Sequence, residues 1–172
     1  WLRQLFALPK GTTGAFTTGA TMANFIGLAS ARHALLKKQG WSVEEDGLFG
    51  APPFRVIISE ESHSTIFKAL QMLGLGRNRV LKVPTDDEGR MQAKDLPELD
   101  ANTLICVQAG NVNTGSFDDI AEICAKAKAA DAWIHLDGAF GMWAAVSEKH
   151  KHLTEGLNQA DSWASDGHKW LN

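Results

Sequence analysis

The stretch TLICVQAGNVNTGSFDDIAEICAKAKAADAWIHLD, residues 103–137, decides the fold. Its first six residues form a continuous apolar run, which predicts a buried strand over 103–108. The segment 117–131 carries acidic residues first and lysines last, and this charge order favours a helix. WIHLD then predicts a second strand that ends at Asp137. A strand, a helix and a strand in this order predict two parallel strands joined by a crossover helix.

The same alternation continues on both sides of this stretch. Further strands are expected at 54–59 (FRVIIS), 79–84 (RVLKVP) and 160–165 (ADSWAS). Further helices are expected at 21–40, 62–74 and around 91–99, and the first of these is apolar nearly all round, which predicts a buried helix. The fold class is therefore predicted to be α/β, with a mostly parallel sheet covered by helices.

The bulk composition restricts the possible functions. The chain has 172 residues, of which 44% are hydrophobic and 22% charged, and its net charge is −3. This charge gives no basic footprint for nucleic acid, and the apolar runs are too short to span a bilayer, so neither partner is expected. Cys106 and Cys124 show neither metal-site nor disulfide-framework spacing, which predicts a cytoplasmic protein.

Four polar positions fall where strands end or helices begin, which is where open α/β sheets bind ligands. TTGAT, residues 17–21, opens a helix and could bind a phosphate, or be only a glycine-rich turn with a threonine cap. His63 could present a flat ring to a flat ligand, or only a polar group near a cap. Asp137 could bind a ligand or form an Asp-Gly turn. Lys169 could be a surface lysine, or a nucleophilic amine whose pKa is lowered in a partly dry place.

A phosphate-binding turn, a ring-stacking histidine, a strand-end carboxylate and a lysine, in this chain order, suit pyridoxal phosphate (PLP). The motifs TTGATMAN, SHSTIFKAL, AGNVNTGSFDDI, WIHLDGAFG and ADSWASDGHKWLN occur in the order and at spacings similar to those of one family. The chain resembles the PLP-dependent decarboxylases of the aromatic-amino-acid and glutamate decarboxylase group. The resemblance implies the large cofactor-binding domain of the aspartate aminotransferase fold, in incomplete form.

The resemblance also implies a role for each matching residue. Lys169 is expected to form the Schiff base, His63 to stack on the cofactor ring, and Asp137 to bind the ring nitrogen. The other implied cofactor contacts are a phosphate-binding turn, a loop residue, a small residue under the ring and a histidine beside the phosphate: Gly19, Ala20 and Thr21, then Asn111, Ala139 and His168.

Three positions depart from the pattern of the family. Asn111 stands where well-known relatives carry threonine, and Gly138 gives DGA where DAA is common. Asp166 stands where some relatives have asparagine near the phosphate. A carboxylate there would repel the phosphate, so Asp166 is expected to point away from it.

The implied reaction is decarboxylation of an L-amino acid, and the amino acid itself is left open. The chain begins inside a helix-like segment at Trp1 and ends just after Lys169, so residues 1–172 are expected to be an internal fragment. An N-terminal segment, a C-terminal small domain and a second subunit of a homodimer are expected to complete the protein. The alternatives are another enzyme of the same fold, such as an aminotransferase, desulfurase or lyase, and a non-catalytic relative.

Overall fold

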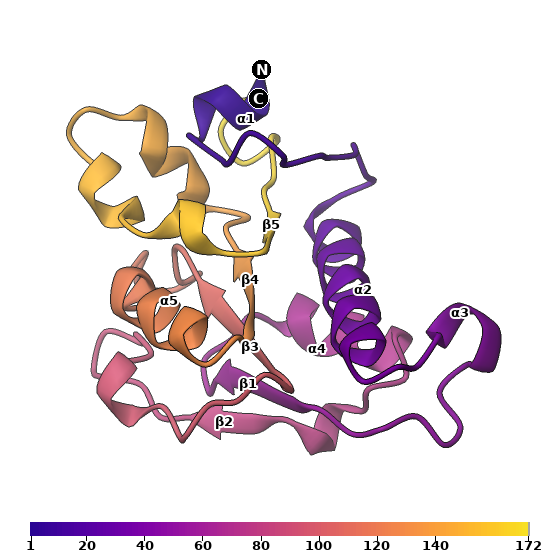
Figure 1. Ribbon diagram of the computed structural model, residues 1–172. Helices are drawn as coiled ribbons and strands as arrows, with labels where there is room; N and C mark the ends of the chain where they lie inside the picture. The colour runs from indigo at the N-terminus through magenta and orange to yellow at the C-terminus, as the bar shows by residue number, and fades with distance from the viewer. Residues whose placement is uncertain (172) are drawn as a thin grey trace.

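The computed structural model describes residues 1–171, and its centre is one parallel sheet (Figure 1). The strands are, in chain order, β1 (Arg55–Ser59), β2 (Leu81–Val83), β3 (Thr103–Gln108), β4 (Trp133–Asp137) and β5 (Ser162–Ala164). Their order across the sheet is β2-β1-β3-β4-β5, and every neighbouring pair is parallel. The predicted α/β fold with a parallel sheet is confirmed.

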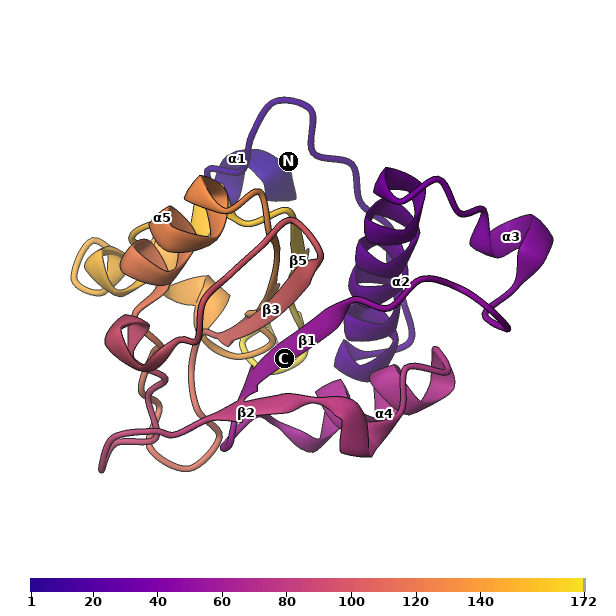
Figure 2. The ribbon, with the colours of Figure 1, turned by 60° about the horizontal axis from the view of Figure 1, so that its bottom comes forward.

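Helices cover both faces of the sheet (Figure 2). On one face lie α2 (Ala20–Lys38) and α4 (Ser64–Met72), and on the other lies α5 (Ile120–Ala129). Two further one-turn helices, α1 (Leu2–Leu5) and α3 (Val43–Asp46), lie outside the sheet layer. Five short 3-10 segments complete the regular structure: Arg77–Arg79, Ala93–Asp95, Gly141–Val146, Lys151–Thr154 and Leu157–Gln159.

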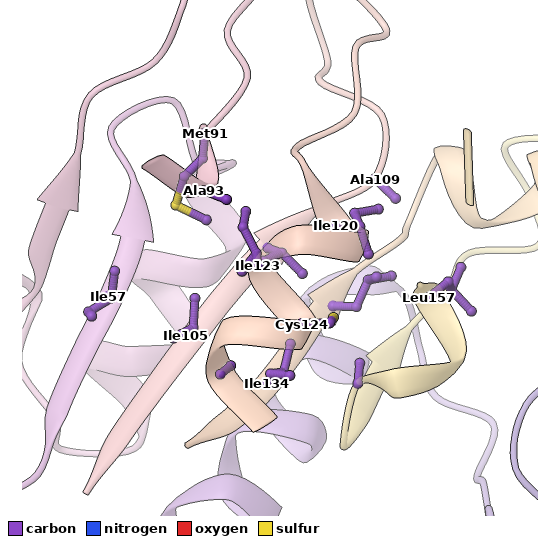
Figure 3. Close-up of a cluster of buried hydrophobic side chains, with 14 of the residues drawn as sticks. Ile57, Met91, Ala93, Ile105, Ala109, Ile120, Ile123, Cys124, Ile134 and Leu157 are labelled. Carbon is purple, nitrogen blue, oxygen red and sulfur yellow. The ribbon is translucent and has the colours of Figure 1, made fainter. Parts of the chain in front are cut away.

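Alternate residues of each strand face different helices, as the pleat of a strand requires. On β3, Ile105 and Val107 pack in the cluster beneath α5, whereas Leu104 and Cys106 pack against α2 and α4. Figure 3 shows Ile123 of α5 lying over this side of the sheet. Residues on both faces are therefore apolar, which explains why the strands read as continuous apolar runs.

On β4 the same alternation separates apolar from polar residues. Ile134 and Leu136 belong to the cluster beneath α5. His135 and Asp137 point to the opposite face, where both contact Asn24 of α2. The α2 side of the sheet is therefore apolar near β1 and β3 and polar at the end of β4.

Three of the expected elements differ from the structure. The short helix around 91–99 is wrong, because only the 3-10 turn Ala93–Asp95 forms there and Leu96, the residue before Pro97, is extended. The strand at 79–84 is shorter than predicted. The helix expected at 62–74 is capped by His63 and not by Ser62, one residue later than predicted.

The long helix α2 was expected to be buried all round, and this is wrong as well. It ends near Gly40 as predicted, where the backbone is left-handed with a φ of 77°. One face packs on the sheet and on α4, but Met22 and Ile26 are 37% and 42% exposed on the other face. No helix within residues 1–171 has both the length and the apolar character needed to cross a bilayer.

Candidate active site

A cavity of about 420 Å³ opens at the C-terminal ends of β1, β3 and β4. The strand order places β2 on one side of β1 and the later strands on the other. The direction in which successive strands are added across the sheet therefore reverses between β1 and β3, although all strands are parallel. Ligands of open α/β sheets bind at such a reversal, outside the carboxyl ends of the strands. His63 follows β1, Gln108 ends β3, and the N–H of His63 donates to Oε1 of Gln108 over 3.2 Å.

The cavity brings together six of the nine predicted site residues. They come from the start of α2, the loops after β1, β3 and β4, and the last turn of the chain: Ala20, His63, Asn111, Asp137, Ala139 and Lys169. Gly19 lines a neighbouring hollow instead, while Thr21 and His168 line neither. Residues more than 100 positions apart in sequence therefore meet at one place.

Asp137 is the buried acid of the cavity. Its side chain accepts hydrogen bonds from Nδ2 of Asn24 over 3.1 Å and from the N–H of Ala139 over 3.2 Å. Burial raises the pKa of this carboxyl, while those two hydrogen bonds and the nearby His63 and Lys169 act in the opposite direction. A buried acid with charged neighbours in a cavity is typical of a functional site.

The start of α2 offers free backbone donors. Gly19 occupies the cap position with a φ of 145° and provides no side-chain cap. No described residue accepts a hydrogen bond from the N–H groups of Ala20 and Thr21. These groups and the helix dipole favour an anion at this point, beside a cavity that Ala20 itself lines.

His63 caps α4 with its own ring. Its Nδ1 lies 2.9 Å from the hydroxyl of Thr65 and accepts from the N–H of Thr65 over 3.3 Å. The structure shows the cap, and it also places His63 in the wall of the cavity, so its ring as a partner of a flat ligand stays a prediction. The two roles are compatible because only Nδ1 is used by the cap.

Lys169 differs from the expectation of a partly dry place. It lines the cavity, but its residue is exposed to solvent. The turn that carries it is attached to the loop after β4, because Nε1 of Trp170 donates to the carbonyl of Phe140 over 2.8 Å. The environment of Lys169 within residues 1–171 is therefore set by this turn and by open solvent.

The residues around Lys169 explain the position of Asp166. The Asp166 carboxylate is buried, and its Oδ1 lies 2.6 Å from Nδ1 of His168. This acid is thus paired with the neighbouring histidine. The hydroxyl of Ser165 beside it is buried without a hydrogen-bond partner among the described residues.

Two of the sequence departures have structural reasons. Asn111 is buried, and its Oδ1 accepts from the N–H groups of Asn113 and Thr114, while its Nδ2 donates to Glu61. It therefore shapes the loop after β3 as a local turn. At Gly138, a Cβ atom would lie 2.7 Å from Cβ of Met142, so an alanine there needs a shift of the following turn.

Sequence reasoning missed three residues of this site. Asn24 is buried beneath the cavity, and the buried Thr65 and Gln108 line it. A signal for Asn24 was present, because a polar side chain inside an apolar helix needs a buried partner. No comparable signal marked Thr65 or Gln108, whose partners lie on other elements. No group of three His, Cys, Asp or Glu side chains in residues 1–171 is placed to bind a metal ion.

The residues present suit PLP on the observations above. A buried carboxylate, an uncapped helix start and a lysine line the same cavity, and the small Ala139 leaves space beside them. These are the groups that a ring nitrogen, a phosphate and an aldehyde need. The donor set therefore fits this cofactor without rearrangement of the sheet.

Comparisons with known proteins agree with this site. Residues 1–172 match the family described as "Pyridoxal-dependent decarboxylase conserved domain". An aromatic-L-amino-acid decarboxylase of Bacillus atrophaeus is 29% identical, over 99% of this chain and 35% of its own. The acidic amino acid decarboxylase GADL1 of Mus musculus is 32% identical, over 94% of this chain and 32% of its own.

A solved structure shows the same fold. The apo crystal structure of mouse CSAD superposes with a TM-score of 0.86 at 29% identity, and the match covers 99% of this chain and 36% of that one. The chain thus spans about a third of the length of the relatives that it matches. The cavity, its residues and the match along the whole sequence agree: the chain belongs to the pyridoxal-dependent decarboxylase family.

Proposed function

We propose that this chain provides the PLP-binding part of an enzyme that removes the α-carboxylate of an L-amino acid. The observation that carries the proposal is the buried carboxylate of Asp137, which shares one cavity with Lys169 and with the uncapped start of α2. The cofactor supplies an electron-accepting ring when it is bound. The chain provides its attachment, its orientation and its electrostatic surroundings.

Each wall of the cavity has a separate task in this proposal. Lys169 would provide the primary amine for the cofactor aldehyde, and Asp137 would hold a proton on the ring nitrogen. His63 and Ala139 would contact the ring. Backbone N–H groups at the start of α2 would bind the phosphate, with Gly19, Ala20, Thr21 and His168 contributing, and Asn111 shapes the adjoining loop.

The orientation of the substrate decides which bond to its Cα breaks, because only a bond parallel to the π orbitals of the ring is weakened. A transaminase commonly holds the substrate carboxylate in the ring plane with an arginine. Among the described residues, no arginine lines the cavity. The match to the pyridoxal-dependent decarboxylase family supports decarboxylation over amino transfer.

The proposal names only the class of the substrate, an L-amino acid, and not one particular amino acid. The two relatives of similar identity are named for aromatic and for acidic amino acids. The cavity offers Val112 and Phe140 as apolar walls and Lys169 as its cationic side chain. We therefore propose an L-amino acid as substrate, bound in a pocket that the rest of the protein completes.

We also propose that the complete protein adds an N-terminal segment, a C-terminal small domain and a second identical subunit. The support is that the chain spans about a third of its relatives. Light scattering of the complete protein measures its mass, and a monomeric mass at the concentration of full activity would contradict the homodimer.

Two measurements on the complete protein test the reaction. Borohydride reduction followed by digestion should leave the phosphopyridoxyl group on Lys169, and the group on another lysine would contradict the assignment. Carboxyl-labelled amino acids should release labelled CO₂. Accumulation of a keto acid in the presence of an added acceptor, without labelled gas, would instead show an aminotransferase.

A further inference from the structure

A chain of hydrogen bonds runs beneath the cavity, from the far edge of the sheet to both of the buried cavity walls. Nε1 of Trp133 donates to the hydroxyl of Ser162 over 3.1 Å, and this hydroxyl lies 2.9 Å from Nδ1 of His135. Nε2 of His135 lies 2.9 Å from Oδ1 of Asn24. Asn24 then donates to Asp137 and, over 3.2 Å, to the hydroxyl of Thr65.

The chemistry of the groups gives this chain one direction. The ionised carboxylate of Asp137 only accepts, so the amide of Asn24 must turn its NH₂ toward it. The amide oxygen then faces His135 and requires a donor, which places the proton of His135 on Nε2. Burial lowers the pKa of His135 to about 3, so this ring stays neutral and its Nδ1 accepts from Ser162.

The same amide also acts on the ring of His63, through the hydroxyl of Thr65. Its second N–H is donated to the Thr65 hydroxyl, which leaves the hydroxyl proton free for Nδ1 of His63. The backbone N–H of Thr65 is directed at the same nitrogen. Nδ1 of His63 is therefore an acceptor, and the ring proton of neutral His63 lies on Nε2.

Close packing of α2 against β4 makes these contacts possible. Gly27 lies one helical turn after Asn24, and a Cβ atom at Gly27 would lie 2.5 Å from Cε1 of His135. Asn24 and His135 are both completely buried. A buried polar network in which every member has a partner fixes one arrangement of its side chains.

We propose that Asn24, oriented by His135, is the positioning residue that aligns Asp137 and turns the Thr65 hydroxyl toward Nδ1 of His63, whose ring tautomer it fixes together with the backbone N–H of Thr65. One amide group thereby coordinates two walls of the cavity that lie on different elements, β4 and the start of α4. The inference rests on the proposed function for its consequence, and on the hydrogen-bond geometry alone for its existence. The two can therefore fail separately.

Histidine tautomers test the network without the cofactor. Magic-angle-spinning NMR of the complete, cofactor-free protein with ¹⁵N-labelled histidine, at pH 8, should show His63 and His135 protonated on Nε2. Signals are assigned by single-histidine substitution. Asn24→Leu removes the donor to Thr65 without adding a second carboxyl beside Asp137. The Thr65 hydroxyl then no longer has to donate to His63, and only the backbone N–H of Thr65 favours an acceptor at Nδ1, so His63 should show a mixture of Nδ1–H and Nε2–H forms. An unchanged His63 tautomer in a folded Asn24→Leu protein would overturn the proposal.

A matched control and a distant pair of variants distinguish positioning from folding. Asn102→Leu makes the same change on the exposed residue before β3 and should leave both tautomers unchanged. Ser162→Ala removes the hydrogen bond to Nδ1 of His135, so the ¹⁵N resonance of Nδ1 should shift while the ring proton stays on Nε2 toward Asn24. Ser162→Thr, which keeps the hydroxyl, should restore the wild-type resonance. An unchanged Nδ1 resonance in Ser162→Ala would remove Ser162 from the network.

Cofactor affinity tests the consequence. Asn24→Ala deprives Asp137 of one of its two hydrogen bonds, and PLP affinity of the complete protein should fall about tenfold, the effect expected for loss of a buried hydrogen bond to a charged group. An affinity equal to that of the wild type would show that Ala139 alone holds Asp137 and would overturn the alignment. A wild-type protein that binds no PLP would refute the proposed function and leave the tautomer result valid.

Discussion

Two carboxylates, Asp137 and Asp118, lie buried near the C-terminal edge of the sheet, and their surroundings are opposite. Asp137 faces the cavity, and its neighbours include His63 and Lys169. Asp118 faces the interior, where its two oxygens accept from the N–H groups of Met91 over 2.8 Å and Gln108 over 2.6 Å.

Burial raises the pKa of both acids, so a raised pKa by itself does not identify the functional one. The partners make the distinction. Both hydrogen bonds of Asp118 come from the backbone, and they join the segment before β3 to the end of β3. Asp137 instead has a side-chain partner, Asn24, and an open cavity on its other side. We infer that Asp118 stabilises the fold and that Asp137 serves a ligand.

The largest expected effect concerns Asp137→Ala in the complete protein. Loss of the group that holds the ring nitrogen should lower kcat/KM by roughly 10²–10³, as removal of one preorganised electrostatic group does in other enzymes. Some cofactor should remain bound through the phosphate turn. The free energy of unfolding should change by less than about 1 kcal/mol, because the loss of the two hydrogen bonds from Asn24 and Ala139 is offset by the relief of burying the carboxyl. Wild-type turnover would show that another group holds the ring.

Asp118→Ala should have the opposite profile. Two backbone N–H groups, of Met91 and Gln108, lose their acceptor in the interior, and this should lower the free energy of unfolding by about 3 kcal/mol. Urea unfolding of the complete protein measures it. Cofactor affinity of the folded fraction should be nearly unchanged. If Asp118→Ala abolished cofactor binding in a protein of unchanged stability, the contrast between the two acids would be lost.

Gly138→Ala tests the close packing behind Asp137. The added Cβ would meet Met142 and Leu136, at 2.7 and 2.9 Å, so the turn after β4 must move at a cost of about 2 kcal/mol. Thermal unfolding measures this loss. Gly14→Ala is the control, because a Cβ there meets nothing within 4 Å. Equal stability of the two variants would show that this turn adapts freely.

The fold was largely readable from the sequence because its parallel strands are apolar on both faces and stand between glycines and polar turns. The 91–99 segment was not, since Pro97 and the tertiary contact of Met91 with Asp118 decide its conformation. The positions of the site residues followed from strand ends and helix starts. The role of Asn24 could be identified only from its three-dimensional contacts with His135 and Asp137, which lie 111 and 113 residues further along the chain.

One part of that contact was visible in the sequence. His135 and Asp137 are two residues apart on a strand and therefore share a face, so two polar side chains in an apolar run had to meet a polar partner. The exposure of Lys169 was not predictable in this way. It depends on the position of the last turn, which is held by the hydrogen bond from Trp170 to the carbonyl of Phe140, a contact between distant segments.

The smallest expected effect is a pH dependence that separates the two acids. Burial raises the pKa of Asp118 from 3.8 to about 7, so between these values the folded protein binds a proton that the unfolded chain has released. The stability contribution is fully present below pH 3.8, falls as pH rises from 3.8 to 7 and is lost above 7; the part between pH 6 and 7 is about 1 kcal/mol. Asp118→Asn should flatten this part of the profile, measured as the difference in unfolding free energy from the wild type. Asp137→Asn should flatten less of it, because His63 and Lys169 favour the charged form of that acid in the native state. Equal flattening by both variants would mean that His63 and Lys169 do not act on Asp137, and that the two buried acids are electrostatically alike.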